Sequence, residues 1–448
     1  MTTLPLPLTS AVAPEPGPIG SVIDYELFLD CVHCGLCTSA CPTYLELGTE
    51  MDSPRGRIYL MRNVVDQKLP LDRHVQRHLD LCLDCRACES ACPSGVQYHQ
   101  LLEPFRAAMQ QRRSAADQPL PAWQRWLLFH VMTHPNRVRW AMLPVRMMQS
   151  LGLDRLLEWS GLSRLIPKRL QQMQAMLPAL PMRHRPLPSF LPAIGPRRAK
   201  VAFLTGCVNE SLFADTNWAS VKVLQWNGCD VWIPRDQGCC GALHAHAGLE
   251  AEAQHKARSI MAQFRRRQVD AVVVNVAGCG SMMKEYVHLL AHTEAAKEAN
   301  AFAAKVRDIS EFLAELRLIP PTNPLPLRAT YHDACHLCHA QQIRQAPREL
   351  LAQIPGLELV PLAESEVCCG AAGSYNLVQP DMAERLGARK AQQLQATQAQ
   401  AIFTANAGCL LQIAKHMKPH SGCRWIAHPM EALWASYSGQ WPTVLRRR

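Results

Sequence analysis

The stretch Cys31-Val-His-Cys34-Gly-Leu-Cys37-Thr-Ser-Ala-Cys41-Pro42 decides the fold of the amino-terminal part of this chain. A second stretch, Cys82-Leu-Asp-Cys85-Arg-Ala-Cys88-Glu-Ser-Ala-Cys92-Pro93, repeats its C-x2-C-x2-C-x3-C-P spacing. Three cysteines at this spacing fit on one turn around an iron-sulfur cube, and the fourth ligates the other cube in two-cluster ferredoxins. The pattern therefore predicts two [4Fe-4S] clusters, one held by Cys31, Cys34, Cys37 and Cys92 and the other by Cys82, Cys85, Cys88 and Cys41.

Other uses of cysteine explain this spacing less well. Zinc sites take four ligands in two pairs, and structural disulfides belong to oxidising compartments. Gly35 favours the cluster interpretation, because a residue without Cβ lets the loop approach a cube closely. Arg55 and Arg57, between the two motifs, either neutralise the clusters or form a solvated basic turn.

The bulk composition limits the architecture. With 448 residues the chain exceeds a single core, and two or three domains are expected. Nineteen cysteines, many in ligand spacings, favour a reducing cytoplasm. The proline-rich first twenty residues do not resemble a secretory signal, and no window approaches eighteen consecutive apolar residues, so an integral membrane protein is not expected.

The sequence divides into five predicted parts. Residues 1–20 form a disordered arm, 21–113 a helical ferredoxin domain, 114–198 a basic helical linker, and 199–320 and 327–440 two α/β repeats. About forty residues separate Pro42 from Cys82 with a helical pattern, in which Ser53 is the expected N-cap and Pro54 the first helical residue. The ferredoxin domain is therefore expected to be of the helical type.

The net charge of +10 is concentrated in the linker. Between residues 112 and 185, twelve Arg or Lys side chains face only three acidic ones. No nucleic-acid recognition motif accompanies them, so nucleic-acid binding is not expected. Trp123, Trp126 and Trp140 follow helical periodicity. The segment is either a linker packed on both flanking domains or a basic face for a membrane surface or an acidic partner.

From Lys200 onward, predicted strands alternate with helices, which indicates a parallel sheet. Strands at 201–204, 230–233 and 271–275 precede cysteines, and strands at 329–335, 357–360 and 401–404 repeat the plan. Cys207 and Cys335 are 128 residues apart, Cys239 and Cys368 are 129 apart, and Cys279 and Cys409 are 130 apart. This near-constant offset indicates an internal duplication.

Each repeat carries its cysteines just beyond the carboxyl ends of strands, the edge where open α/β sheets bind ligands. Four thiols are expected to meet in each repeat: Cys207, Cys239, Cys240 and Cys279, and then Cys335, Cys368, Cys369 and Cys409. Two interpretations stay open, a third metal or redox centre and simple packing of buried cysteines. Gly241 and Gly370 are expected to relieve crowding beside such a centre.

Several other side chains near these loops have no fixed role. The nearby histidines are candidate ligands, hydrogen-bond donors to sulfur, or ordinary core residues: His244, His246, His332, His336 and His339. Cys229, Cys338 and Cys423 are interpreted as incidental.

Two ferredoxin motifs with Asp52-Ser-Pro-Arg-Gly-Arg57 between them, followed by duplicated Cys-Cys-Gly domains, resemble the glycolate oxidase iron-sulfur subunit family along nearly the whole chain. Relatives on this plan serve lactate utilisation, anaerobic glycerol-3-phosphate oxidation and heterodisulfide reduction. The resemblance implies a cytoplasmic or peripherally membrane-bound complex. In it, two flavin-binding subunits oxidise glycolate to glyoxylate, and this chain passes the electrons toward a quinone.

The sequence contains no Gly-x-Gly-x-x-Gly fingerprint for flavin or nicotinamide and no nucleophile elbow. No flavin and no catalytic residue for substrate-bond chemistry are therefore expected in this chain. A self-contained disulfide or quinone reductase acting at the Cys-Cys-Gly site, and a noncatalytic scaffold, are the alternatives. Met282 and Gln412 stand where the fuller Cys-Cys-Gly pattern has a further cysteine, which argues against a noncubane cluster and against disulfide cleavage.

Overall fold

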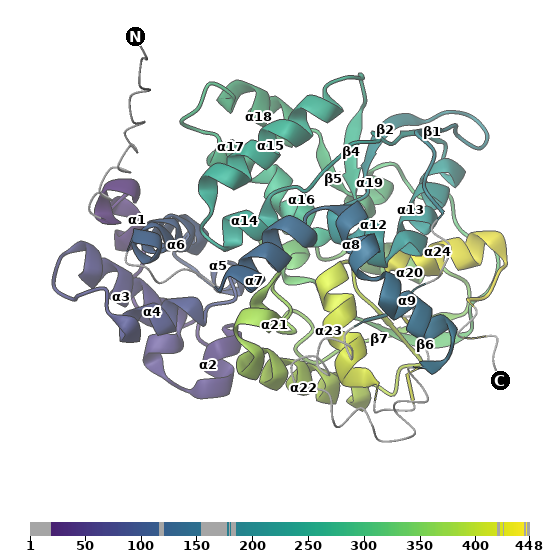
Figure 1. The fold of residues 1–448 in the computed structure, drawn as a ribbon. Helices are drawn as coiled ribbons and strands as arrows, with labels where there is room; N and C mark the ends of the chain where they lie inside the picture. Colours follow the sequence, from purple (N-terminus) through teal and green to yellow (C-terminus); the bar gives the residue numbers. More distant parts are fainter. Residues whose placement is uncertain are drawn as a thin grey trace, which may run out of the picture.

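The computed structural model describes residues 19–115, 121–153, 177–178, 180, 185–418, 422–423, 425–442 and 445. Most of the predicted amino-terminal arm and residues 154–176 of the predicted linker lie outside the described residues. A helical domain precedes two α/β units, and the basic segment runs across the first of these units (Figure 1).

The amino-terminal domain contains no strand among its described residues. Its elements are η1 (Ile19–Val22), α1 (Glu26–Leu29), α2 (Pro42–Leu47), η2 (Glu50–Asp52), α3 (Pro54–Val65), α4 (Arg73–Asp80), α5 (Ala87–Ser90) and α6 (Tyr98–Ala115). Ser53 caps α3 as predicted, because its side chain accepts a hydrogen bond from the Gly56 backbone at 3.0 Å. Phe28, Met61 and Phe105 pack in its buried core. The helical type of ferredoxin domain is thus confirmed.

The described part of the linker is helical and packs on the first repeat. It comprises α7 (Ala122–Arg125), the π-helix η3 (Trp126–Val131), α8 (Pro135–Ala141) and α9 (Leu143–Ser150). Val131 and Val138 bury their side chains with Leu212, and the Arg146 guanidinium donates to the Ser211 carbonyl at 3.1 Å. Its tryptophans face outward: Trp123 is 55% exposed, Trp126 61% and Trp140 74%.

The first repeat is a five-stranded sheet in the order β1-β3-β2-β4-β5. The strands are β1 (Phe190–Leu191), β2 (Ala199–Leu204), β3 (Cys229–Trp232), β4 (Ala271–Val274) and β5 (Val306–Asp308). All pairs are parallel except β1 with β3, an antiparallel edge that the sequence analysis did not predict. The helices are α12 (Cys207–Leu212), α13 (Ala214–Trp226), α14 (Ala242–His246), α15 (Glu250–Phe264), α16 (Ala277–Lys284), α17 (Tyr286–Leu289), α18 (Ala296–Ala303) and α19 (Ile309–Glu315).

The second repeat has a parallel sheet in the order β7-β6-β8-β9. The strands are β6 (Leu327–Tyr331), β7 (Leu357–Val360), β8 (Ala401–Phe403) and β9 (Trp425–Ala427). The helices are the π-helix η5 (His336–Ala340), α20 (Ala346–Ala352), α21 (Tyr375–Val378), α22 (Pro380–Ala396), α23 (Ala407–Met417) and α24 (Pro429–Ser438). Because β3-β2-β4-β5 and β7-β6-β8-β9 have the same order, the predicted duplication is confirmed.

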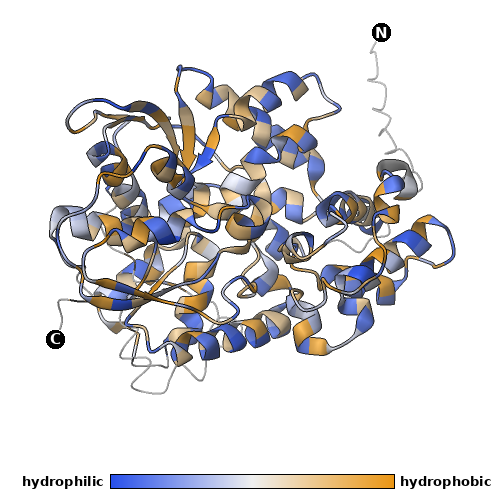
Figure 2. Cartoon of the chain, turned by 180° about the vertical axis from the view of Figure 1, so that it is seen from behind, coloured by the Kyte–Doolittle hydropathy of each residue, from blue (hydrophilic) through white to orange (hydrophobic). Residues whose placement is uncertain are grey.

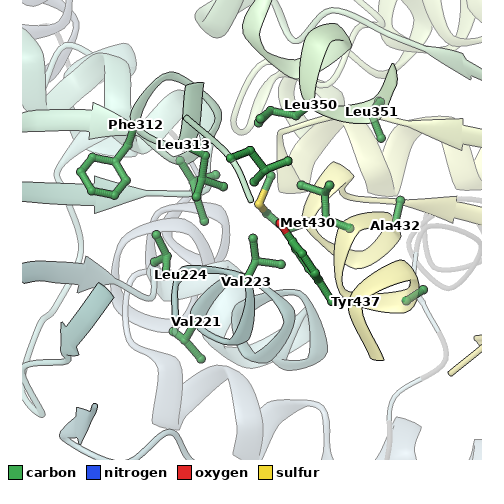
Figure 3. Close-up of a cluster of buried hydrophobic side chains, with 14 of the residues drawn as sticks. Val221, Val223, Leu224, Phe312, Leu313, Leu350, Leu351, Met430, Ala432 and Tyr437 are labelled. Atoms are coloured by element: carbon green, nitrogen blue, oxygen red, sulfur yellow. The ribbon is translucent and has the colours of Figure 1, made fainter. Parts of the chain in front are cut away.

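The duplication extends to the last helix of each repeat. Asp308 caps α19 and His428 caps α24, and in both cases a glutamate three residues later completes a capping box. The helices α13, α19, α20 and α24 then meet between the two sheets, where Val223, Leu313, Leu351 and Met430 belong to one buried cluster (Figure 3). The strands are coloured mainly as hydrophobic, while the surrounding helices show hydrophilic residues as well (Figure 2). Burial of this shared core fixes the two repeats against each other.

Candidate metal-binding cysteine sites

The first predicted ligand set lines one cavity. Cys31, Cys34, Cys37 and Cys92 surround it together with Cys88, and Arg55, Val96 and Tyr98 form part of its wall. Gly35 turns the loop with φ +85°, and a Cβ at this position would lie 2.5 Å from Nη1 of Arg55. The loop needs a glycine here because the backbone is left-handed and the arginine is close.

The second predicted set lines another cavity. Cys82, Cys85 and Cys88 share it with Cys41, so the last cysteine of the first motif faces the second motif. Pro42 begins α2 directly after Cys41. Cys88 lines both cavities, which places the two cysteine sets next to each other.

A buried arginine supplies positive charge to this second cavity. Arg57 is 1% exposed; its Nη1 lies 3.8 Å from Sγ of Cys41, and its Nη2 donates to Thr43 Oγ1 at 3.0 Å. Burial opposes its charge, but nearby Cys82, Tyr98 and Cys41 raise the pKa of Arg57 above its usual value. Of the two open interpretations for Arg57, charge compensation fits the structure, since a solvated turn would be exposed.

The chemistry of these two cavities fits an iron-sulfur group. Burial raises the pKa of Cys37 to about 11 and the pKa values of Cys85 and Cys88 well above their usual range. Thiols in such a setting stay protonated unless a cation compensates them, and a bound metal deprotonates a coordinating thiol. Each cavity provides four soft donors, the set that a [4Fe-4S] cube takes.

In the first repeat, the carboxyl ends of adjacent strands β3, β2 and β4 bring four thiols together as predicted. The thiols of Cys207, Cys239, Cys240 and Cys279 interact in that order along a row. The Cys207 and Cys240 thiols lower the pKa of Cys239 well below its usual value, while contact with the neighbouring thiols raises the pKa values of Cys207 and Cys240.

In the second repeat the thiols of Cys335, Cys368, Cys369 and Cys409 form a similar row. The Sγ atoms of Cys335 and Cys368 are 3.9 Å apart. Cys335 and Cys368 also belong to a buried cluster with Cys85 of the ferredoxin domain. Two of the four second-repeat thiols thus lie beside Cys85, which lines the second ferredoxin cavity.

The glycines after the two Cys-Cys pairs lie close to the helix that follows each pair. Gly241 and Gly370 have φ values of +94° and +87°. A Cβ on Gly370 would lie 3.0 Å from the Ala383 carbonyl oxygen on α22, and one on Gly241 would lie 3.2 Å from the Ala253 carbonyl oxygen on α15. Both glycines therefore relieve crowding against the following helix.

The five candidate histidines occupy different positions. His336 Nδ1 lies 3.4 Å from Sγ of Cys335, whereas His339 contacts Ser90 Oγ at 3.0 Å. His244 packs on the ring of Phe129 at a centroid distance of 4.9 Å. His332 is fully buried, and neither ring nitrogen makes a hydrogen bond of ordinary geometry. Burial lowers its pKa well below the usual value, and the nearby Ser365 backbone opposes this effect.

The three cysteines interpreted as incidental are not members of the thiol rows, although Cys338 lies next to Cys335. Cys229 is a core residue of β3, and the Cys423 thiol donates to the Trp425 carbonyl. The Cys338 thiol donates to the Cys335 carbonyl at 3.8 Å.

The sequence analysis missed a buried lysine and a buried ion-pair network. Lys390 on α22 is 2% exposed, and its ammonium donates to the Glu364 carbonyl. Burial lowers the pKa of Lys390, and nearby Cys369 and Cys368 oppose this effect. Lys390 lies at helical spacing from Leu386, Gly387 and Leu394 on the buried face of α22, so the periodicity of this helix could have indicated its burial.

The missed network is centred on Asp84, between two cysteines of the second motif. Its Oδ2 lies 3.3 Å from Nδ1 of His246, and Arg106 lies 4.0 Å away. Although burial opposes ionisation, His246, Arg106 and Arg86 lower the pKa of Asp84. Asp84, His246 and Arg106 border a cavity of about 370 Å³ that also reaches Cys82.

Comparisons with known families cover most of the chain. The profile of the 4Fe-4S dicluster domain matches residues 28–96, and that of the cysteine-rich domain matches residues 201–284 and 329–414. The profile of the glycolate oxidase iron-sulfur subunit linker region matches residues 120–177. Among the described residues, no helix is both long enough and apolar enough to span a bilayer.

Individual relatives agree with these matches. The chain is 42% identical over 402 residues to a probable glycolate oxidase iron-sulfur subunit of Bacillus subtilis, covering 87% of this chain and 89% of the relative. It is 34% identical over 397 residues to the glycolate oxidase iron-sulfur subunit of Escherichia coli, covering 86% and 89%. It is also 31% identical over 216 residues to lactate utilization protein A of Geobacillus thermodenitrificans, covering 48% and 90%. The chain belongs to the family of glycolate oxidase iron-sulfur subunits.

Proposed function

We propose that this chain is the electron-transfer subunit of a complex that oxidises glycolate to glyoxylate, receiving electrons from two flavin-binding partner subunits and delivering them to a quinone-type acceptor. The observation that carries the proposal is the pair of adjacent cavities, each lined by one predicted set of four cysteines. The names of the relatives from Bacillus subtilis and Escherichia coli support glycolate as the substrate of the complex.

The residues of the two cavities have separate tasks in this proposal. Cys31, Cys34, Cys37 and Cys92 hold one [4Fe-4S] cluster, and Cys41, Cys82, Cys85 and Cys88 hold the other. Bound there, such clusters exchange one electron at a time, which divides the two electrons of a reduced flavin into single steps. Arg57 compensates the negative charge of the second set.

The position of the second repeat supports a third metal centre next to the two ferredoxin clusters. Its thiols Cys335 and Cys368 pack against Cys85 across the domain boundary. Buried thiolates are costly unless a cation or hydrogen bonds compensate them, and a bound metal supplies that compensation when it deprotonates the thiols. We include Cys335, Cys368, Cys369 and Cys409 as ligands of a further metal centre. The row Cys207, Cys239, Cys240 and Cys279 is the corresponding candidate in the first repeat.

The cavity of about 370 Å³ beside Cys82 supports a site for the acceptor. Its volume falls in the range of small-molecule pockets, and Leu83, Met109 and Phe129 give it an apolar wall. A quinone takes up two electrons and two protons to become a quinol. His246, held by Asp84, faces this cavity and is placed to donate one proton, and solvent at the open side supplies the other.

The decisive experiment uses the complex purified anaerobically with its natural partners. Glycolate is expected to reduce the clusters, as followed by EPR and visible absorption. A Cys34→Ser variant is expected to lose one cluster signal and electron transfer, whereas Cys423→Ser, outside the cysteine cavities, is expected to retain both. Reduction by lactate or glycerol 3-phosphate but not glycolate would contradict the substrate, and disulfide turnover by the lone chain would contradict the electron-transfer role.

A further inference from the structure

His332 is a buried histidine that lacks an ordinary explanation. It follows β6 directly, its side chain is 0% exposed, and neither ring nitrogen makes a hydrogen bond of ordinary geometry, although the Ser365 backbone lies near the ring. Burying a polar group without a partner costs free energy, commonly about 1–3 kcal/mol in proteins. A buried imidazole in this state is well suited to a partner that is not a protein atom.

The surroundings of His332 identify the kind of partner. A ring nitrogen of His332 and the Sγ atoms of Cys369 and Cys409 all lie within 4.8 Å of one another. Ligands of a tetrahedral ion with bonds of about 2.0–2.3 Å lie roughly 3.3–3.8 Å apart. Side-chain movements of about 1 Å therefore bring the three atoms into one coordination sphere. Imidazole and thiolate donors together suit iron and zinc.

The first repeat does not offer this set. The offset of 128 that relates Cys207 to Cys335 places Leu204 at the position of His332. Nearby, Asn209, Asn217 and Asn275 satisfy one another, with Asn209 Nδ2 donating to Asn217 Oδ1 at 2.6 Å. Within the part of the chain that the structure describes, His332, Cys369 and Cys409 are the one thiol-containing trio of ligand atoms this close.

The residue at the missing cysteine position supports the same assignment. Gln412 stands where the fuller Cys-Cys-Gly pattern has a further cysteine. Its Nε2 donates to the Ala383 carbonyl at 2.8 Å, so its amide is engaged with α22. His332 approaches Cys369 and Cys409 from β6 instead.

We propose that His332, Cys369 and Cys409 bind one transition-metal ion of the iron or zinc class, with His332 in place of the absent cysteine. The inference rests on the proposed metal centre of the second repeat and names a ligand that cysteine spacing does not reveal. It also makes the two repeats unequal, because only the second has an imidazole ligand among its described residues.

The test measures iron and zinc per chain by mass spectrometry in the anaerobically purified complex. His332→Ala is expected to lose about one or more metal ions per chain, while the EPR signals of the ferredoxin domain persist. The matched control is His428→Asn, which replaces an equally buried histidine of the same repeat that caps α24. It is expected to keep the full metal content. Unchanged iron and zinc in His332→Ala would overturn the proposal.

A second measurement does not depend on the folding of the alanine variant. His332→Cys is expected to retain the metal, because a thiolate replaces the imidazole. If the ion is iron, pulsed EPR of protein with ¹⁵N-labelled histidine shows a nitrogen coupling in the wild type and none in His332→Cys. If it is zinc, X-ray absorption at the zinc edge shows the same change. A wild-type spectrum without a histidine nitrogen would overturn the proposal.

These results are separable from the proposed function. Glycolate-dependent reduction of the ferredoxin clusters is measured on the same samples. Its absence contradicts the electron-transfer role in glycolate oxidation, whatever the metal content of the His332 variants. Its presence together with an unchanged metal content contradicts the His332 assignment alone.

Discussion

Nη1 of Arg57 lies 3.8 Å from Sγ of Cys41, and both side chains are buried. Replacing Arg57 by Gln removes a positive charge beside the second cysteine cavity, so reduction there becomes less favourable. We expect the reduction potential of that centre to fall by about 60 mV, which is about a tenfold change in a one-electron equilibrium. A redox titration followed by EPR measures the change.

Arg55→Gln is the matched control for this prediction. Arg55 is 30% exposed and forms an ion pair with Glu50 at 2.6 Å, so water already screens its charge. Its replacement is expected to shift either potential by less than half as much. Equal shifts in the two variants would contradict a special role for Arg57.

The exchange of fourth ligands gives a second prediction. Cys41 is the last cysteine of the first motif in sequence but lines the cavity of Cys82, Cys85 and Cys88. Cys41→Ser is therefore expected to alter the EPR signal that Cys85→Ser also alters. Cys92→Ser is expected to alter the other signal, shared with Cys34→Ser. If each variant instead affected the signal of its own motif, the exchange would be wrong.

The cysteine sets were predictable because their geometry is local. Three ligands two residues apart need one turn of chain, and the proline after the fourth directs it away from the others. The thiol rows of the Cys-Cys-Gly repeats could be predicted from the alternation of strands and helices alone, since parallel strands end at one edge of their sheet. In both cases the spacing along the chain contains most of the geometry.

What the sequence did not reveal depends on contacts between distant segments. Cys85 and Cys335 belong to different domains, and no pattern in either one indicates that they share a buried cluster. In the sequence, Lys390 is one of several charged residues of a helix, and His332 is one of several histidines near the cysteines. Strand β1 is two residues long and is held by pairing with β3, which propensity over so short a stretch cannot indicate.

The glycine after the second Cys-Cys pair gives a prediction about stability. Gly370→Ala is expected to destabilise the protein, because a left-handed backbone costs about 1–2 kcal/mol for alanine and its Cβ would meet Ala383 and Leu386 at 3.0 Å. Gly195→Ala is the control, since φ is +79° but no atom lies within 4 Å of a Cβ there. Thermal unfolding of both variants measures the difference, expected to be roughly 1–3 kcal/mol. Equal unfolding temperatures would contradict the contact.

The cap of α24 gives a prediction about pH. Burial lowers the pKa of His428 to about 3, and its ring accepts a hydrogen bond from the Met430 backbone in the neutral form. Below a pH of about 6.5, the His428 ring is therefore protonated in the unfolded chain but stays neutral in the folded chain. The free energy of unfolding thus decreases as the pH falls from about 6.5 toward 3. The slope is at most about 1.4 kcal/mol per pH unit.

His428→Asn isolates this contribution, because asparagine can cap a helix but does not titrate. The unfolding temperature of the variant is expected to fall less steeply between pH 6.5 and 5 than that of the wild type. Asp308 caps the equivalent helix, and burial raises its pKa to about 6, so its charge destabilises the fold as pH rises. Parallel slopes for the variant and the wild type would contradict the role assigned to His428.

The acceptor cavity gives the last prediction. His246 borders it and is oriented by Asp84 at 3.3 Å, so His246→Leu removes the proposed proton donor. Loss of a general acid slows its reaction by about 10²- to 10⁴-fold. Quinone reduction by the complex is expected to fall in this range, while the first turnover of cluster reduction by glycolate keeps its rate. His255→Leu, at an exposed position of α15, is expected to leave both rates unchanged. Stopped-flow spectroscopy measures the rates of the two half-reactions separately. A loss confined to cluster reduction would place His246 on the path by which electrons enter, not at the acceptor. An unchanged rate of quinone reduction would exclude this cavity as the acceptor site.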